Sequence, residues 1–272
     1  MKLSIITVNL NNAEGLRKTI ESVVTQTFTD YEYIIIDGGS TDRSVDIIKH
    51  YADKIAYWVS EPDKGIYNAM NKGILQAKGE YCLFLNSGDY LFAENTLELC
   101  FNEVEENYDI IYGNVISTDR TGKIKTWIAP QPEEFTAISF NYITLFHPSS
   151  FIKKNIFDIC GLYDDKYKIV SDWKLWLITI IKNHVSIKKI DIPVAYFEKN
   201  GISSDRIILN NERKAVYEEL FHPVELRDME KLISYYSLET VRKNKITWFF
   251  YKILYRIANK LNSKIKNDIL VK

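Results

Sequence analysis

The chain has 272 residues, 46% of them hydrophobic, which is enough to bury a sizeable core in two domains or in one large α/β domain with an appendage. A formal net charge of -1 gives no basis for nucleic-acid binding. Three scattered cysteines without CxxC spacing are typical of reduced thiols. The apolar run near the N-terminus is too short for a signal peptide, and no apolar run has the length that a bilayer requires.

The first half of the chain alternates strand and helix patterns. Strands are predicted at residues 3–8, 31–37, 56–59 and 81–85. Helices are predicted from an Asn11 cap to Thr25, after GGSTD with Ser40 or Thr41 as the cap, and through Ala69 to a stop at Gly79. This alternation predicts βαβ units with right-handed crossovers around a parallel sheet. Further on, a hairpin is predicted around residues 121–122 and more strands within 185–197.

A polar cluster follows each of the four predicted strands. These clusters are residues 7–9, 37–39, 60–63 and 86–89. Ligands of open α/β sheets bind beyond the carboxyl ends of the strands, so the clusters are expected to converge. Three of them contain an Asp, and neighbouring carboxylates need a cation or hydrogen-bond donors for compensation. Any one Asp alone fits an ordinary turn or cap equally well, but four strand ends together favour a ligand site.

The sequence restricts which nucleotide ligand this edge can hold. No GxGxxG follows the first strand and no GxxxxGK[ST] is present, so dinucleotide-dehydrogenase and P-loop sites are excluded. A nucleoside diphosphate that leaves during a reaction needs its charge neutralised. Because few basic residues lie in these loops, a divalent cation is the simplest solution.

Four segments, SIITVNLN, IIIDGGSTD, SEPDKGIYNAMNKGI and GEYCLFLNSGDYL, together resemble family-2 glycosyltransferases of the GT-A fold across residues 1–92. The third segment is similar to a subgroup that builds bacterial capsule and exopolysaccharide units, such as colanic acid. HPSSFIKK, CGLYDDKY, SDWKLW and NGIS extend the resemblance to about residue 205.

This resemblance implies an α/β GT-A fold, with a Rossmann-like mixed sheet, helices on both faces and a C-terminal helical tail. It implies a glycosyltransferase domain at 1–205, with a nucleotide-sugar half at 1–92 and an acceptor half at 93–205, followed by a helical extension at 206–272.

The resemblance also implies a donor site for a nucleotide-diphosphate sugar, with a UDP-sugar favoured. The matching residues are Thr7, Asn9, Asp37, Gly38, Asp63, Asn71, Asn86 and Ser87. Thr7 and Asn9 would line the base pocket, and Asp37 would accept the imide N–H of uracil. Asp63 would lie near the base and ribose. Asn71 fits a contact with the donor and a helix-surface role equally well.

LNSGD, residues 85–89, stands in the place of the family's acidic DxD-type motif, which binds Mn2+ or Mg2+ on the donor diphosphate. Asp89 matches the last carboxylate of that motif. Asn86 replaces the usual Asp and Gly88 replaces the middle acid, so the site has lost charge although the Asn86 carbonyl can still act as a ligand. The alternative for Asp89 is a helix N-cap, for which Asn95 or Thr96 is better placed.

Asp172 in SDW matches the family's catalytic base and follows Ser171, where Glu is more usual. An inverting transfer needs one such base to take the proton of the acceptor hydroxyl. The alternative is that Asp172 caps the following helix, where its charge also favours the helix dipole. His147 and Trp173 are assigned to the acceptor side, although His147 fits a packing role as well.

The end of the chain is basic and amphipathic. Eight Lys or Arg residues and no acidic residue lie between Thr240 and Asn267, with apolar residues at helical spacing. This pattern predicts peripheral contact with an anionic membrane, or else packing on protein. It would place the protein in the cytoplasm, at the inner face of the cell membrane.

The combined expectation is an inverting, non-processive glycosyltransferase of cell-surface polysaccharide biosynthesis, acting on a glycan or polyprenyl-linked acceptor. Two alternatives stay open: a nucleotide-sugar pyrophosphorylase and a catalytically degenerate nucleotide-sugar-binding module. NLNNAEGLRKT lacks the Gly-rich loop of the pyrophosphorylase, while the weakened LNSGD motif keeps the binding module open. No QxxRW segment is present, which disfavours a processive synthase.

Overall fold

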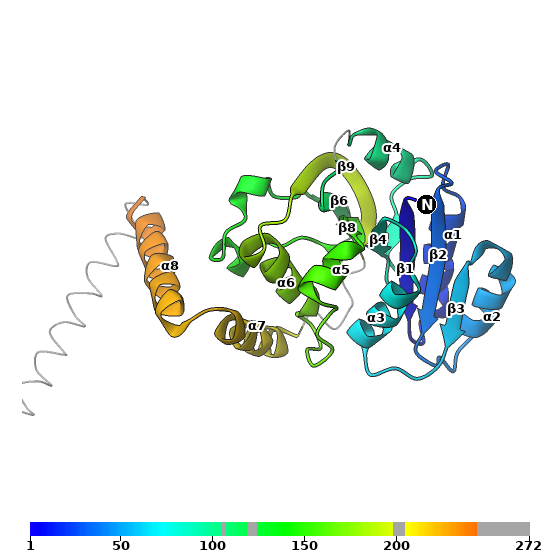
Figure 1. Ribbon diagram of the computed structural model, residues 1–272, viewed down its shortest axis with the longest axis horizontal. Helices are drawn as coiled ribbons and strands as arrows, with labels where there is room; N and C mark the ends of the chain where they lie inside the picture. The colour runs from blue at the N-terminus through cyan, green and yellow to red at the C-terminus, as the bar shows by residue number, and fades with distance from the viewer. Residues whose placement is uncertain (105–106, 119–123, 198–204, 244–272) are drawn as a thin grey trace, which may run out of the picture. The chain divides into compact units, whose positions relative to one another are not determined.

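The computed structural model describes residues 1–104, 107–118, 124–197 and 205–243. The chain divides into two compact units, Met1–Val216 and Tyr217–Lys272. Nine strands of the described residues form one mixed sheet in the order β3-β2-β1-β4-β8-β6-β9-β5, with β7 beside β6. Figure 1 shows β3, β2, β1 and β4 side by side in this order. The strands are β1 (Leu3–Asn9), β2 (Tyr31–Asp37), β3 (Tyr57–Ser60), β4 (Tyr81–Phe84), β5 (Tyr90–Leu91), β6 (Ile110–Thr118), β7 (Ile124–Trp127), β8 (Ser150–Lys153) and β9 (Ile187–Phe197).

The described α-helices follow the predicted alternation in the first half of the chain. They are α1 (Ala13–Val24), α2 (Ser44–His50), α3 (Ile66–Gln76), α4 (Thr96–Asn102), α5 (Asn155–Cys160), α6 (Ser171–Trp176), α7 (Arg206–Leu220) and α8 (Pro223–Lys243). Strands β1 to β4 form only parallel pairs among themselves, whereas β8 pairs antiparallel with β4 and with β6. The α/β mixed sheet expected from the sequence is therefore confirmed.

Helices cover both faces of the parallel part of the sheet. Successive side chains of a strand point to opposite faces, so both faces have apolar side chains to bury. Leu3 and Ile5 of β1 belong to a core cluster that includes Leu16 and Ile20 of α1. Ile6 points the other way, toward α3, where Gly73 lies against its side chain. The β-branched runs are therefore buried on both faces, as is typical of parallel strands.

Two predicted helix caps are wrong by a few residues. Asn12, not Asn11, caps α1, with its Oδ1 accepting a hydrogen bond from Gly15 N at 3.1 Å. Asn11 instead has a positive φ of 50° and accepts a hydrogen bond from Thr41 N. Neither Ser40 nor Thr41 caps α2, which begins at Ser44, because the Ser40 hydroxyl donates to Asp37.

The second half of the chain completes the sheet. Strands β6 and β7 pair antiparallel from Val115↔Trp127 to Thr118↔Ile124, as the predicted hairpin requires, although its turn lies outside the described residues. Within residues 185–197, where more than one strand was expected, the structure has the single strand β9, which pairs with β6 and β5.

In the tail, α7 and α8 are helical, as predicted. Most of the basic segment from Thr240 to Asn267, and all of NGIS, lie outside the described residues. Among the helices that are described, none combines the length and the hydropathy of a membrane span.

The close approach of α3 to β1 depends on Gly73, because a Cβ there would collide with the Cγ2 of Ile6 and reach the Cγ1 of Ile36 at 3.6 Å. We expect Gly73→Val to lower the free energy of unfolding by about 1–3 kcal/mol, the usual cost of overpacking a core. Urea unfolding measures this. Leu75→Ala on the exposed face of α3 is the control and should change stability little; equal stability of both variants would contradict this packing.

Candidate active site

The register of three parallel strands places polar side chains in one row at the edge of the sheet. Asn9 at the end of β1 pairs with Asp37 at the end of β2, and Asp37 pairs with Ser60 at the end of β3. The predicted convergence of the ends of β1, β2 and β3 is therefore confirmed, because these three residues are paired with one another. This row lies at the carboxyl edge, where open α/β sheets bind ligands.

Asp37 is fully buried, and its carboxylate accepts four hydrogen bonds. Oδ1 accepts from Asn9 Nδ2 at 2.7 Å and from Ser40 Oγ at 2.6 Å, while Oδ2 accepts from Ser40 N at 2.9 Å and Ser60 Oγ at 2.6 Å. Burial alone raises the pKa of Asp37, but these donors outweigh it and hold the pKa below the ordinary 3.8. A uracil N–H would have to replace one of the Ser donors, so the imide contact stays a prediction.

Other residues of the predicted donor site surround this row. Thr7 is buried, with its Oγ1 3.0 Å from the hydroxyl of Tyr33. Asp63 is partly buried, and its Oδ1 accepts from Gly65 N at 2.8 Å. A Cβ at Gly38 would lie 2.5 Å from Asp63 Oδ2, so only glycine lets this carboxylate reach the turn after β2. Asp63 therefore lies beside the base-pocket row.

The segment after β4 forms a tight turn that is fixed by α1. Thr19 Oγ1 donates to the backbone oxygen of Asp89 at 2.7 Å and accepts from Gly88 N at 3.0 Å. Asn12 Nδ2 donates to the backbone oxygen of Ser87 at 2.9 Å. Gly88 has a φ of 106°, which explains why glycine occupies the middle position of this motif. Asp89 precedes α4 by several residues and does not cap it.

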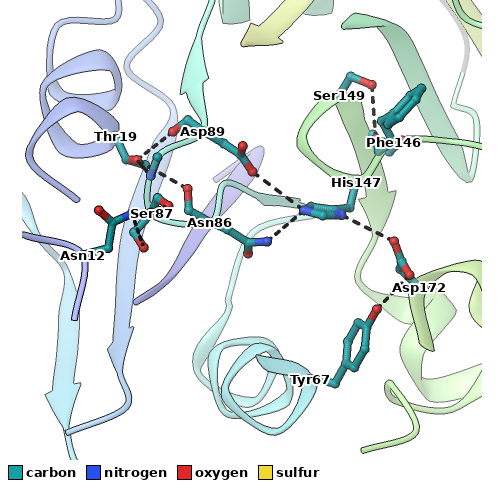
Figure 2. Close-up of polar contacts among 12 residues, drawn as sticks. Asn12, Thr19, Tyr67, Asn86, Ser87, Asp89, Phe146, His147, Ser149 and Asp172 are labelled. Atoms are coloured by element: carbon teal, nitrogen blue, oxygen red, sulfur yellow. Dashed lines mark hydrogen bonds and ion pairs between the residues drawn. The ribbon is translucent and has the colours of Figure 1, made fainter. Parts of the chain in front are cut away.

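His147 lies between the two acidic residues assigned to metal binding and to base catalysis (Figure 2). Its Nε2 is 3.9 Å from Asp89 Oδ2 and 3.0 Å from Asn86 Nδ2, and its Nδ1 is 3.5 Å from Asp172 Oδ2. The His147 side chain is 15% exposed, so it contacts these groups with limited access to water. One imidazole ring thus joins the LNSGD turn to the start of α6.

Asp172 is the second residue of α6, which begins at Ser171, so its side chain does not act as the N-cap. Its Oδ1 accepts from the hydroxyl of Tyr67 on α3 at 2.9 Å, and the carboxylate keeps 22% exposure. A partly exposed carboxylate with one oxygen held in place has the accessibility that a general base needs.

Two predicted site residues have structural partners here. Asn71 Nδ2 donates to Tyr163 O at 2.7 Å, and its Oδ1 accepts from Tyr163 N at 3.0 Å. Trp173 is only 3% exposed and donates from Nε1 to Phe140 O at 3.0 Å. These contacts join α3 and α6 to neighbouring loops, and the ligand contacts assigned to Asn71 and Trp173 stay predictions.

Whether this site can hold a divalent metal ion depends on the donor atoms that its side chains provide. Among the described residues, no group of three or more His, Cys, Asp and Glu side chains is arranged to hold a metal ion. Asp89 and His147 lie together, however, and Asn86 Oδ1 beside them is buried without a hydrogen-bond partner. Two oxygens and one imidazole nitrogen fit a Mn2+ or Mg2+ ion that completes its shell with water and phosphate oxygens.

Several contacts of this site were not expected from the sequence. Ser40 and Ser60 saturate Asp37, and Tyr67 holds Asp172. All three lie within or beside the segments that carry the family resemblance, and Ser60 also belongs to the polar cluster predicted at residues 60–63. Their partners lie between 3 and 105 positions away, so local patterns do not reveal the contacts.

Comparison with protein families identifies the class. The sequence profile described as "Glycosyl transferase family 2" matches residues 4–161, more than half of the chain, and the chain belongs to this family. It is 28% identical over 210 residues to a PGL/p-HBAD biosynthesis glycosyltransferase of Mycobacterium bovis, covering 75% of this chain and 80% of that protein. It is 27% identical over 267 residues to an uncharacterized glycosyltransferase of Methanocaldococcus jannaschii, covering 93% and 85%.

Solved structures show the same fold. S. aureus TarS 1-349 in complex with UDP-GlcNAc aligns with a TM-score of 0.60 and 19% identity, over 74% of this chain and 59% of that one. The mannosyltransferase PcManGT from Pyrobaculum calidifontis, in complex with GDP-Man and Mn2+, aligns with a TM-score of 0.59 and 17% identity, over 80% and 63%. The chain spans less than two thirds of the length of these structures. The shared architecture confirms the GT-A fold expected from the sequence.

The saturated Asp37 predicts a pH-dependent stability. Because its folded pKa is lowered, its contribution is complete above the ordinary pKa of 3.8 and is lost as the pH falls through the folded value. We expect Asp37→Asn to lower the free energy of unfolding at pH 7 by about 2 kcal/mol, since charged hydrogen bonds are lost. The difference should shrink as the pH falls below 3.8. Denaturant unfolding across this range measures it.

Asp53→Asn is the matched control, because the Asp53 carboxylate is 72% exposed. It should leave the unfolding curves close to those of the original chain at every pH. A difference between Asp37→Asn and the original chain that does not depend on pH would contradict the role of the ionised carboxylate.

Proposed function

We propose that the chain is an inverting, non-processive glycosyltransferase that moves a sugar from a nucleotide-diphosphate sugar to a glycan or lipid-linked acceptor. The observation that carries this proposal is the position of His147 between Asp89 and Asp172. One imidazole ring separates the carboxylate expected at the donor diphosphate from the carboxylate expected at the acceptor hydroxyl. Direct displacement at an anomeric carbon needs these two functions on adjacent sides of one site.

Separate groups of residues bind the nucleoside and the diphosphate of the donor. The row Asn9–Asp37–Ser60 and the adjoining Asp63 receive the nucleoside at the edge of the sheet. The turn carrying Asn86 and Asp89 faces the diphosphate. Mn2+ or Mg2+ held by Asp89, with Asn86 and His147 beside it, would neutralise the charge of the leaving nucleoside diphosphate.

On the acceptor side, Asp172 takes the proton of the attacking hydroxyl. The acceptor oxygen then bonds to the anomeric carbon, and the bond from that carbon to the phosphate oxygen breaks with its electron pair. No nucleophilic side chain and no covalent intermediate are required, so the configuration at the anomeric carbon is inverted. His147 lies 3.5 Å from Asp172 Oδ2 and lines the space between the base and the diphosphate side.

A UDP-sugar is the favoured donor, in agreement with the UDP-GlcNAc complex of TarS, while the GDP-Man complex of PcManGT makes a GDP-sugar the second choice to test. Cell-surface polysaccharide, such as capsule or exopolysaccharide, is the proposed destination of the sugar. Peripheral contact of the basic tail with the inner face of the cell membrane, where a polyprenyl-linked acceptor would lie, forms part of this proposal.

Family membership favours sugar transfer over the pyrophosphorylase alternative. A degenerate binding module is distinguished by one assay: release of nucleoside diphosphate from a panel of UDP- and GDP-sugars with an acceptor present, with and without Mn2+. A transferase releases the diphosphate, a pyrophosphorylase instead consumes pyrophosphate and forms a nucleoside triphosphate, and a binding module does neither.

The first prediction concerns the metal. Asp89→Ala should weaken Mn2+-dependent UDP binding by more than about 10-fold, because the charged ligand is lost. Asn86→Asp restores an acid at the first position of the motif and should keep or tighten the metal dependence. Calorimetric titration of UDP with and without Mn2+ measures both. Glu94→Ala, an exposed acid a few residues away, is the control, and unchanged metal dependence in Asp89→Ala would remove Asp89 from the site.

The second prediction concerns the base. Asp172→Asn keeps the shape of the side chain but cannot take a proton, so turnover should fall by about 100-fold or more. UDP binding should persist, because this residue faces the acceptor. Asp165→Asn, the same chemical change at an exposed position of the same half, should keep full activity. Near-normal transfer by Asp172→Asn, with an unchanged melting temperature, would show that another group acts as the base.

A further inference from the structure

The carboxylate of Glu212 on α7 accepts hydrogen bonds from three successive backbone N–H groups. Its Oε1 accepts from Lys168 N at 2.8 Å, and its Oε2 accepts from Ile169 N at 2.9 Å and from Val170 N at 3.3 Å. These three residues come directly before α6, whose second residue is Asp172. A side chain 42 to 44 positions further along the chain therefore holds the segment that leads to the proposed base.

The segment before α6 needs this distant acceptor. Valine has no side-chain acceptor, so Val170 at the N-cap position cannot bind backbone N–H groups, and Ile169 before it is also apolar. Both residues are buried, so water competes little for their N–H groups. A buried N–H group without an acceptor is costly. The conformation of this segment is therefore tied to α7.

Arg213, the next residue of α7, contacts the residue that follows Asp172. Its guanidinium carbon is 5.0 Å from the centroid of the Trp173 ring, within the range of a cation–π interaction. Its Nη1 donates to Asn141 O at 3.4 Å. Consecutive residues of α7 therefore contact the backbone before Asp172 and the ring after it.

We propose that Glu212 is a positioning residue for Asp172: its carboxylate fixes the backbone of residues 168–170, and this backbone sets where the Asp172 carboxylate enters the site. The inference rests on the proposed function and deepens it, because it assigns a residue that orients the base without touching donor or acceptor. α7 begins at Arg206, in the segment that the sequence assigned to a helical extension. The first helix of this extension thus serves the acceptor side of the site.

The three hydrogen bonds require both oxygens of the Glu212 carboxylate. Gln has the size of Glu but only one oxygen, and its amide nitrogen is a donor. In Glu212→Gln the amide would face at least one backbone N–H, so a hydrogen bond is replaced by two donors in contact. The variant therefore releases the segment before α6 without leaving a cavity. Glu218→Gln, the same chemical change at an exposed position of the same helix, is the matched control.

Hydrolysis of UDP-GlcNAc, or of whichever UDP- or GDP-sugar in the panel the original chain hydrolyses fastest, provides the rate, with water as the acceptor. Glu212→Gln should lower kcat by about 10-fold, because a displaced base is poorly oriented toward the acceptor oxygen. The donor KM should stay close to its original value, since the segment before α6 is not part of the donor site. Glu218→Gln should keep both constants.

Glu212→Asp is a second variant, which keeps the charge and both oxygens on a shorter side chain. It should lower kcat less than Glu212→Gln does, again with the original donor KM. It gives the same comparison if Glu212→Gln does not fold, and an unchanged kcat in the variants that fold overturns the positioning role.

A double-mutant cycle separates positioning of the base from other effects on the rate. If Glu212 acts through Asp172, Glu212→Gln should have little further effect on kcat in the Asp172→Asn background, because the group that it orients has already lost its function. A further loss of about 10-fold in this background would show that Glu212 acts by another route, and would overturn the proposal.

A third measurement does not need activity. Amide hydrogen exchange of residues 168–170, followed by NMR, should be at least about 10-fold faster in Glu212→Gln than in the original chain or in Glu218→Gln. The backbone amide signal of Asp172 should also move in Glu212→Gln and not in the control. Unchanged exchange, or an Asp172 signal that does not move, overturns the proposal. Exchange that becomes equally faster in β1 would show a general loss of stability and would overturn it as well.

The positioning role and the proposed function fail in different ways. If residues 168–170 and Asp172 respond as expected but the original chain releases no nucleoside diphosphate from any donor, the proposed function fails while the contact between α7 and the segment before α6 stands. If the original chain is active and Glu212→Gln keeps its kcat, the positioning role fails while the proposed function stands.

Discussion

The contact of His147 with Asp89 on one side and Asp172 on the other is the constraint on which the site depends. Buried or half-buried carboxylates are unfavourable unless donors or cations compensate for their charge. His147 Nε2 lies 3.9 Å from Asp89 Oδ2 and Nδ1 lies 3.5 Å from Asp172 Oδ2, so one ring lies between the two carboxylates. The turn after β4 and the start of α6 must therefore stay close together, and the space between them is where donor and acceptor would meet.

Asp37 at the end of β2 and Asp89 in the LNSGD turn have different hydrogen-bond surroundings. Asp37 has all of its acceptor capacity filled by Asn9, Ser40 and Ser60, and the strand register fixes this arrangement before any ligand arrives. Among the described residues, two amide oxygens of the site are buried without a hydrogen-bond partner: Asn86 Oδ1 in the LNSGD turn and Asn9 Oδ1 in the row. A saturated group favours rigidity, whereas an unsatisfied buried oxygen is costly and favours a ligand that provides the missing contact. Both places therefore favour a ligand, and metal and diphosphate are proposed at the LNSGD turn because the Asp37 carboxylate already accepts four hydrogen bonds. The turn instead brings the Asp89 carboxylate and Asn86 Oδ1 together as metal-ligand atoms.

Local sequence patterns predict much of the fold, but they predict only part of the site. The four parallel strands and the polar residues at their ends were predicted because buried β-branched runs and turn residues are local signals. The α1 cap was misassigned because Asn11 and Asn12 are equally good caps locally. The structure decides between them through the contact of Asn11 with Thr41, which lies 30 positions away.

Long-range side-chain contacts explain the rest of what the sequence did not reveal. Asp172 was singled out by its motif, but its bond to Tyr67 joins residues 105 positions apart. His147 was predicted on the acceptor side, yet nothing in HPSSFIKK indicates that its ring also reaches Asp89. Trp173 is buried and donates to Phe140 O, 33 positions away, a contact that no local pattern reveals, and its assignment to the acceptor side stays a prediction.

A crystal structure of the chain with UDP and Mn2+ tests the central claim most directly. The account predicts uracil at the row formed by Asn9, Asp37 and Ser60, and a metal ion on the diphosphate with Asp89 as a ligand. It also predicts Asp172 on the open side of the β-phosphate, with its carboxylate facing the space for the acceptor. Nucleotide density at another edge of the sheet, or a metal held without Asp89, would contradict the account.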